Sequence, residues 1–189
     1  EKASAASLWV AEFFKKSKFR DNNIIYGYTK SKNYLTKNYV NIKLKSINSK
    51  FISSTSEYSE KLIKEISSKN FDIVEIHNRP HYFNLINNLN HTKKVLFFHN
   101  NPLEMQGSVT AKDRMKLYNN ADFIVVNSNW TKRKFLKNLL ISPDDSKIKI
   151  IPQSTSKVKI DFSKKKKIIS FVGKLNSAKG YDIFGEAII

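Results

Sequence analysis

The chain has 189 residues, of which 40% are hydrophobic and none is cysteine, and its formal net charge is +18. This length suits one to one and a half domains, and the composition excludes collagen-like, low-complexity and fully disordered chains. The lack of cysteine excludes a disulfide framework, a thiolate zinc site and a cysteine nucleophile, and without a run of about 18 apolar residues no membrane span is predicted.

Lysine accounts for most of the positive charge, because only four of the 34 basic residues are arginine. Asparagine, with 20 residues, and isoleucine, with 21, are also frequent, and all three amino acids have A/T-rich codons. Base composition of the gene therefore explains the charge better than a dedicated nucleic-acid function, for which arginine is the preferred residue. An anionic ligand, an acidic membrane surface and nucleic acid remain alternatives.

The first 70 residues predict two helices and two short strands. In chain order these are an amphipathic helix over Ser4–Phe14, a strand over Asn23–Tyr26, a short strand over Val40–Leu44 within a loop-rich connection, and a helix over Ser56–Ser68. Leu62, Ile63 and Ile66 form the apolar stripe of the second helix.

From Phe71 onward, short apolar runs alternate with helical stretches. The runs are Asp72–Ile76, Lys94–Phe98, Asp122–Val126, Ile148–Ile151 and Ile168–Val172. Such nearly continuous runs are typical of strands buried on both faces of a parallel sheet. Helices are predicted between them at Tyr82–Leu89, Lys112–Asn119 and Trp130–Leu139. The alternation predicts an α/β fold with right-handed crossovers.

The polar stretch Ser154–Lys167, which ends in four lysines, predicts a domain boundary. The strand after it and a helix beginning near Tyr181 cannot bury both their faces alone. We therefore expect a first domain at residues 1–155, a linker at 156–167 and the start of a second domain at 168–189. We also expect the first domain to lack its first strand and the second to be truncated.

Polar residues follow all five apolar runs. They are His77-Asn78-Arg79-Pro80, His99-Asn100-Asn101-Pro102, Asn127-Ser128-Asn129, Gln153-Ser154 and Gly173-Lys174-Leu175-Asn176. Ligands of open parallel sheets bind at the carboxyl ends of the strands, so this pattern predicts a cleft for a hydroxyl-rich or phosphate-bearing ligand. The alternative is that these are ordinary polar loops, and that His99 only forms a hydrogen bond to a neighbouring loop.

Metal binding is not expected. His77 and His81 lie four residues apart, but Pro80 stands between them and the acidic residue of a zinc helix is missing.

A phosphate site is predicted near the carboxyl end. Gly173 follows an apolar run, and Lys174 and Lys179 flank the start of a predicted helix, where backbone N–H groups favour anions. Leu175 stands where a Walker P-loop has Ser or Thr, and the pattern is no dinucleotide-binding turn either. Ordinary surface lysines are the alternative.

The segment from Phe171 to Phe184, FVGKLNSAKGYDIF, resembles the FVGRLxxxKG segment that opens the donor-binding domain of retaining glycosyltransferases of family 4, which have the GT-B fold. Upstream features agree, namely His99 at a strand end with a following Asn, ADFIVVNSNW leading into a helix, and IKIIPQ before a linker. The resemblance covers most of the chain from Phe71 to Ile189.

The resemblance implies two Rossmann-like domains and transfer from a nucleotide-diphosphate sugar, with retention of configuration and without a metal or other cofactor. The acceptor would be a saccharide or a lipid-linked sugar, in cell-surface polysaccharide or lipopolysaccharide synthesis. The enzyme would be cytoplasmic and peripheral at the inner face of an acidic membrane, where each surface lysine near anionic lipid contributes about 1 kcal/mol.

The resemblance also implies site residues. His99 corresponds to the strand-end histidine near donor sugar and acceptor, and the donor diphosphate would lie on Gly173, Lys174 and Lys179. Asn78, Arg79 and Ser128 would line the acceptor side. Lys174 departs from the usual arginine, so a point charge replaces a bidentate fork. The paired glutamates of the family would fall beyond Ile189, so the chain alone is expected to be inactive.

A non-enzymatic module that binds nucleic acid is the alternative function. Tyrosines that could stack on bases interleave with lysines, at Tyr26, Tyr28, Lys30, Lys32, Tyr34, Lys37 and Tyr39. No aromatic-rich RNA-binding strand motif is present, so no nucleic-acid partner is expected.

Overall fold

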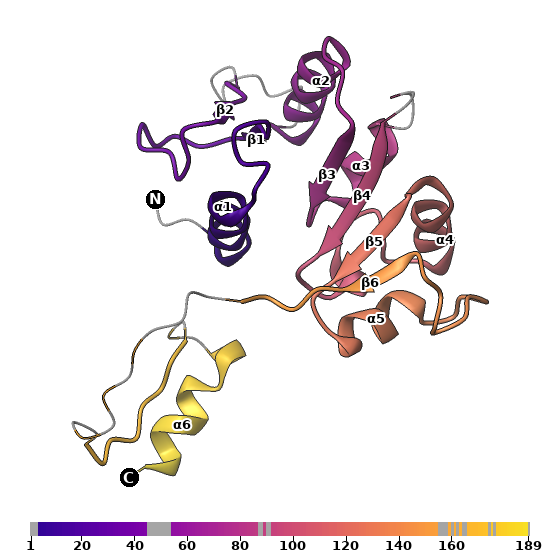
Figure 1. Ribbon diagram of the computed structural model, residues 1–189. Helices are drawn as coiled ribbons and strands as arrows, with labels where there is room; N and C mark the ends of the chain where they lie inside the picture. The colour runs from indigo at the N-terminus through magenta and orange to yellow at the C-terminus, as the bar shows by residue number, and fades with distance from the viewer. Residues whose placement is uncertain are drawn as a thin grey trace. The chain divides into compact units, whose positions relative to one another are not determined.

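The computed structural model describes residues 4–44, 54–86, 89, 92–154, 159, 161, 163, 166–173, 175 and 177–188 (Figure 1). The chain divides into two compact units, Glu1–Thr155 and Ser156–Ile189. All strands of the described residues lie in the first unit.

A four-stranded parallel sheet forms the centre of the first unit (Figure 1). Its strands are β3 (Ile73–His77), β4 (Lys93–Phe98), β5 (Phe123–Val126) and β6 (Ile148–Ile150), and they lie side by side in chain order. Because every pair is parallel, the carboxyl ends of all four strands meet at one edge of the sheet. The predicted α/β fold is confirmed.

Four helices cover one face of this sheet. They are α2 (Ser54–Ser67), α3 (Pro80–Phe83), α4 (Ala111–Asn120) and α5 (Asn129–Leu136). The side chains that form this core include Leu62, Ile66, Phe83, Leu96, Leu117, Ile124 and Phe135. Thr110 begins α4 with a capping box, in which its side chain and that of Asp113 each accept from the other's backbone N–H.

The helix predicted over Tyr82–Leu89 is wrong in its bounds. The structure has α3 from Pro80 to Phe83, followed by a single 3-10 turn, η1 (Asn84–Ile86). Pro80 accounts for the earlier start, because its fixed φ and missing N–H suit the first position of a helix. Of the last three residues of the predicted helix, 87 and 88 lie outside the described residues.

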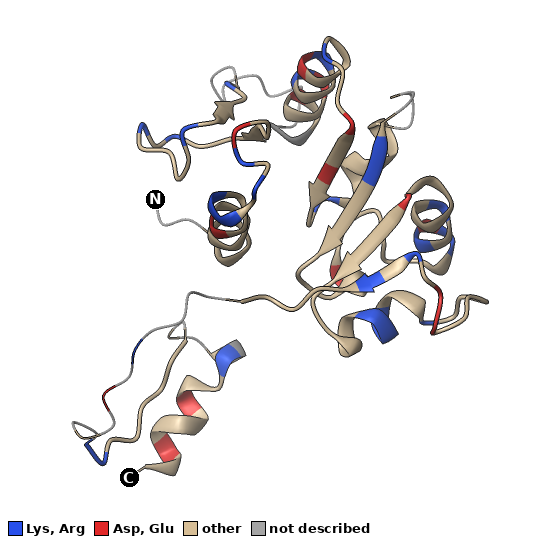
Figure 2. Ribbon diagram, in the orientation of Figure 1, with Lys and Arg blue, Asp and Glu red and all other residues tan. Residues whose placement is uncertain are grey.

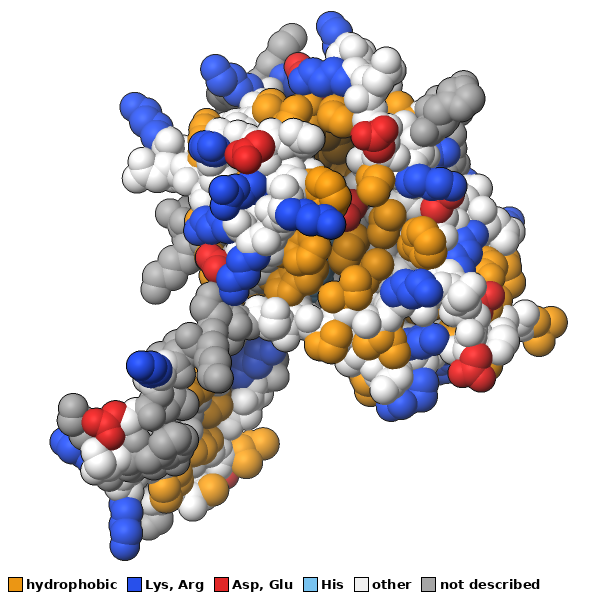
Figure 3. Space-filling model, in the orientation of Figure 1, with side chains coloured by type: hydrophobic (Ala, Val, Ile, Leu, Met, Phe, Trp, Pro, Cys, Tyr) orange, Lys and Arg blue, Asp and Glu red, His pale blue; other side chains and the backbone are white. Residues whose placement is uncertain are grey.

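Among the described residues of the first unit, α1 (Ala5–Lys16) covers part of the opposite face of the sheet. Trp9 of this helix packs with Val95, Phe97 and Val125 in a second small core. Farther along the same face, Ile73 and Phe123 stay about half exposed. Figure 3 shows hydrophobic side chains gathered on one face of the molecule with Lys and Arg around them. The strands β1 (Ile25–Gly27) and β2 (Tyr39–Asn41) pair in parallel as a separate two-stranded sheet.

The second unit contains a 3-10 turn, η4 (Ser177–Lys179), and the helix α6 (Tyr181–Ala187). The strand predicted over Ile168–Val172 is wrong, because these residues have no strand in the structure. A strand is stabilised by hydrogen bonds to a neighbouring strand, and the described residues of this unit offer none. Ile168 and Val172 are accordingly 68% and 94% exposed. Across the described parts of the chain, no helix is long and apolar enough to cross a membrane.

Candidate active site

The carboxyl ends of the four strands converge on His99, which follows β4. His99 Nε2 lies 3.0 Å from Nδ1 of His77, the last residue of β3. His99 Nδ1 lies 3.0 Å from the side-chain nitrogen of Gln153, which follows β6. The Asn127 amide, just after β5, donates to the backbone carbonyl of His99 at 2.8 Å. The structure therefore brings together polar residues from all four strand ends.

Asn78 fixes the backbone of His99 from the side of β3. It adopts a left-handed conformation with φ of 54°, which asparagine tolerates better than most residues. In this conformation its backbone N–H donates to the Phe97 carbonyl at 2.9 Å, and its side-chain oxygen accepts from the backbone N–H of His99 at 2.7 Å. The side-chain oxygen of Asn78 therefore holds the backbone of His99 in place.

The surroundings of His99 favour a neutral imidazole. The residue is 9% exposed, and the Trp9 ring lies 4.9 Å from its ring between centroids. Burial, and to a lesser extent the nearby His77, lower the pKa of His99 to about 4. At neutral pH the side chain can therefore both accept and donate a hydrogen bond without carrying charge.

The two other residues predicted on the acceptor side have different positions. Arg79 is exposed at the start of α3, where its guanidinium donates to the Asn78 carbonyl at 3.4 Å. Ser128 caps α5, because its hydroxyl accepts from the Thr131 backbone N–H at 3.2 Å. Their roles toward an acceptor stay predictions, and Arg79 has the freer side chain.

The donor-phosphate prediction falls in the second unit. A side chain placed on Gly173 would approach Cβ of Lys179 to 3.9 Å, so these two residues are neighbours. Lys179 is exposed in η4, whereas Lys174 lies outside the described residues. The phosphate role of all three stays a prediction.

Two residues near His99 were missed from the sequence. Glu75 stands two residues before His77 on β3, and its carboxylate lies 3.4 Å from Nε2 of His77. The alternation of strand side chains could have placed both on one face. Trp9 was visible as part of an amphipathic helix, but nothing in the helix pattern shows which part of the sheet it covers.

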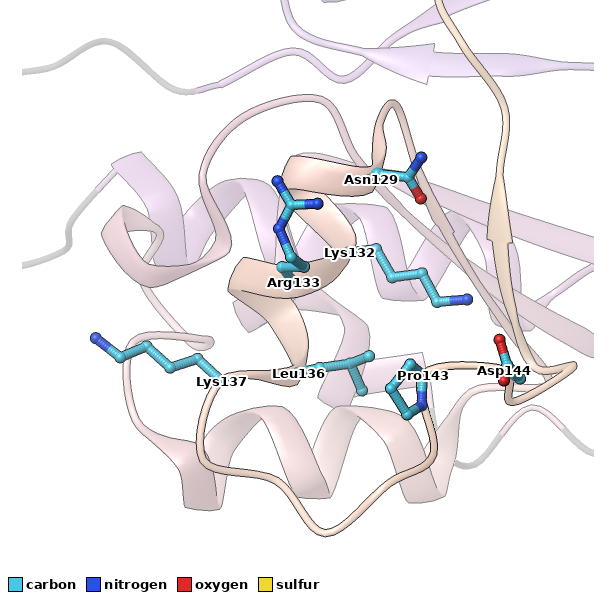
Figure 4. Close-up of a pocket in the computed structure, with 7 residues that line it drawn as sticks. All are labelled: Asn129, Lys132, Arg133, Leu136, Lys137, Pro143 and Asp144. Atoms are coloured by element: carbon cyan, nitrogen blue, oxygen red, sulfur yellow. The ribbon is translucent and has the colours of Figure 1, made fainter.

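A surface hollow lined partly by basic side chains does not form a second anion site. It has a volume of about 330 Å³ and lies beside α5. Figure 4 shows that Lys132, Arg133 and Lys137 around it point in different directions. Because their cationic groups do not converge, no single anion would contact them all.

Other features of the described residues bear on the remaining predictions. Nowhere in them do three or more His, Asp or Glu side chains gather to hold a metal ion. Lys and Arg are spread over α1, α2, β4, α4 and α5 (Figure 2). Three tyrosines of the nucleic-acid alternative have partners within the fold, since Tyr26 accepts from Lys69 at 2.9 Å and Tyr34 and Tyr39 pack on each other.

Comparison with known proteins identifies the family. The sequence model of Glycosyltransferase Family 4 matches residues 29–154, which is about two thirds of the chain and includes every strand end around His99. No curated protein and no solved structure matches the chain. The extent of the family match, over the α/β unit that holds the converging strand ends, shows that the chain belongs to Glycosyltransferase Family 4.

Proposed function

We propose that the first unit is the acceptor-side domain of a retaining glycosyltransferase with the GT-B fold, and that His99 is its catalytic residue. The observation that carries this proposal is the convergence of four strand ends on one buried, neutral histidine. A neutral imidazole at the carboxyl edge of a parallel sheet can exchange hydrogen bonds with sugar hydroxyls.

The donor in this proposal is a nucleotide-diphosphate sugar. Its diphosphate would lie on Gly173, Lys174 and Lys179, where the absence of a side chain on the glycine permits close approach and the lysines supply positive charge. Positive charge at this place stabilises the leaving nucleoside diphosphate, so the transfer needs no metal ion. The closeness of Gly173 and Lys179 supports the assignment.

The acceptor in this proposal is a saccharide or a lipid-linked sugar, held by Asn78, Arg79 and Ser128. Arg79 supports it best, because its guanidinium is exposed beside the strand end of β3. The reaction would belong to cell-surface polysaccharide or lipopolysaccharide synthesis. The protein would work in the cytoplasm, with its lysines against an acidic membrane surface.

The test uses the product of the complete reading frame with a panel of nucleotide-diphosphate sugars. We expect release of nucleoside diphosphate with one of them, and a product whose anomeric configuration, read by NMR, equals that of the donor. His99→Ala should lower kcat more than donor affinity. An inverted product would refute the retaining mechanism, and an unchanged rate in His99→Ala would make His99 structural.

Donor binding is tested separately by calorimetry. Lys179→Ala should weaken binding of the nucleotide-diphosphate sugar by about 1–3 kcal/mol, the value of a lost charge-assisted hydrogen bond. Lys159→Ala removes the same charge from an exposed position before the fifth apolar run, Ile168–Val172, and should leave donor affinity unchanged. Equal affinities in both variants would exclude Lys179 from the phosphate site.

A further inference from the structure

A chain of side-chain contacts crosses the site and passes through both imidazole rings. The Gln153 amide nitrogen lies 3.0 Å from His99 Nδ1, and His99 Nε2 lies 3.0 Å from His77 Nδ1. His77 Nε2 in turn lies 3.4 Å from a carboxylate oxygen of Glu75. Each ring therefore uses both of its nitrogens.

One arrangement of protons satisfies every contact in this chain. The amide nitrogen of Gln153 can only donate, so Nδ1 of His99 accepts and its Nε2 carries the hydrogen. His99 then donates to Nδ1 of His77, which leaves the hydrogen of His77 on Nε2. There it faces the carboxylate of Glu75, which can only accept.

The opposite tautomers produce two mismatches. Hydrogen on Nδ1 of His99 would face the donor amide of Gln153. Nε2 of His99 would then accept from His77, and the free lone pair of His77 would face the Glu75 carboxylate. The opposed donors at the Gln153 end are relieved if the amide turns over and presents its oxygen, but the opposed acceptors at the Glu75 end remain. The opposite tautomers therefore lose about the value of one hydrogen bond, and Glu75 and His77 decide which tautomer forms.

Packing keeps the rings in the geometry that this chain needs. The His77 ring stacks on Phe97 with centroids 4.3 Å apart, and Trp9 lies 6.0 Å from His77 and 4.9 Å from His99. The two edges of His99 differ, however. Its Nε2 edge faces His77, whose side chain is 19% exposed, whereas its Nδ1 edge faces Gln153, which is exposed.

We propose that Glu75 and His77 are positioning residues that hold His99 in the tautomer with hydrogen on Nε2. Nδ1 is then the nitrogen that exchanges the Gln153 amide for a hydroxyl group of a ligand. The inference rests on the proposed function only in giving His99 a part in sugar transfer. The tautomer itself is a property of the chain without substrate.

The tautomer is tested first, by long-range ¹H–¹⁵N NMR of the imidazoles of the chain at neutral pH. In the wild type we expect a protonated Nε2 and a lone pair on Nδ1 for His99. His77→Phe keeps a ring on Phe97 but removes the acceptor. The exposed Gln153 amide can then turn either its nitrogen or its oxygen toward Nδ1, so His99 should become a mixture of both tautomers. In His77→Gln the amide oxygen can accept again and should restore the single tautomer.

Glu75→Gln tests the last contact in the series from Gln153 to Glu75. It should shift the imidazole signals of His77 toward a mixture of both tautomers. Glu65→Gln makes the same change at an exposed position of α2 and should leave both rings unchanged. Circular dichroism of each variant shows whether it is folded. A wild-type His99 with hydrogen on Nδ1, or a folded His77→Phe with an unchanged His99 tautomer, would overturn the proposal.

The second measurement uses sugar transfer by the product of the complete reading frame. His77→Phe should lower kcat about two- to tenfold, equivalent to one hydrogen bond, with little change in KM for the donor, and His77→Gln should recover most of it. If His99 has the single tautomer with hydrogen on Nε2 but no sugar transfer is found, the proposed function is refuted and the tautomer proposal stands. Transfer that is insensitive to His77→Phe would refute the positioning role alone.

Discussion

Arg114 is the buried cation that joins the elements around the site, and its loss should be costly. It lies on α4 with 2% of its surface exposed. Its guanidinium donates to four backbone carbonyls, those of Phe135 at 2.7 Å, Ser108 at 3.0 Å, Val109 at 2.7 Å and Lys137 at 2.6 Å. Two of these belong to the connection between His99 and α4, and two lie at the carboxyl-terminal end of α5.

Arg114→Met removes all five N–H donors and keeps an unbranched apolar chain. A hydrogen bond from a charged donor contributes about 1.5–3 kcal/mol, and a buried carbonyl left without a partner costs about 1–3 kcal/mol. Releasing the guanidinium from burial returns several kcal/mol. We therefore expect a net loss of about 3–5 kcal/mol in the free energy of unfolding, a large part of the 5–15 kcal/mol typical of a domain.

Urea unfolding followed by circular dichroism measures this change. Lys112→Met, at an exposed position of the same helix, should stay within about 0.5 kcal/mol of the wild type. Arg114→Lys should have a free energy of unfolding between those of Arg114→Met and the wild type, because three donors on one nitrogen cannot reach four carbonyls. An Arg114→Met variant within about 1 kcal/mol of the wild type would refute the reasoning that these carbonyls depend on Arg114.

Three other changes test the sheet and its edge. Trp9→Ala should cost about 3–5 kcal/mol in urea unfolding, because the ring is buried on the sheet, whereas Leu8→Ala, half exposed on the same helix, should cost far less. The low pKa of His99 means that the unfolded chain binds a proton below about pH 6.5 and the folded chain only near pH 4. Stability should therefore fall by about 2 kcal/mol between pH 7 and pH 5, and His99→Gln should remove this part of the slope. Hydrogen bonds from the Lys94 backbone N–H and the Lys93 side chain lower the pKa of Asp122, so stability should be lost as pH falls below about 4, and Asp122→Asn should flatten that acid limb. If the pH dependence of stability were unchanged in His99→Gln or in Asp122→Asn, the substituted residue would not be the group that causes it.

The strands of the main sheet could be predicted because buried parallel strands leave a plain signal in the sequence. Val95 to Phe98 and Phe123 to Val126 are apolar throughout, and few other structures need that pattern. His99 could be placed at the ligand-binding edge for the same reason, since it comes directly after such a run, whereas its choice as the catalytic candidate came from the family resemblance.

Long-range contacts could not be predicted in this way. Arginine is usually exposed, so nothing in the pattern of α4 marks Arg114 as buried, and its four acceptors come from loops and helix ends. For Ile168–Val172 the sequence predicted a strand that the structure does not have. An apolar run forms a strand only where a neighbouring strand supplies hydrogen bonds, and the run itself does not show whether one is present.

The proposed roles of His99 and Lys179 differ because one side chain is buried and neutral and the other is exposed and charged. His99 is neutral because it stands at the end of a central strand beneath Trp9, where burial lowers its pKa. A neutral imidazole suits hydroxyl groups, but it cannot offset the charge of a diphosphate. A diphosphate is better bound by exposed cations, which keep their charge at no cost of burial. Lys179 is such a cation and lies beside Gly173. A buried neutral imidazole and an exposed cation therefore need opposite surroundings, so the same position could not supply both contacts.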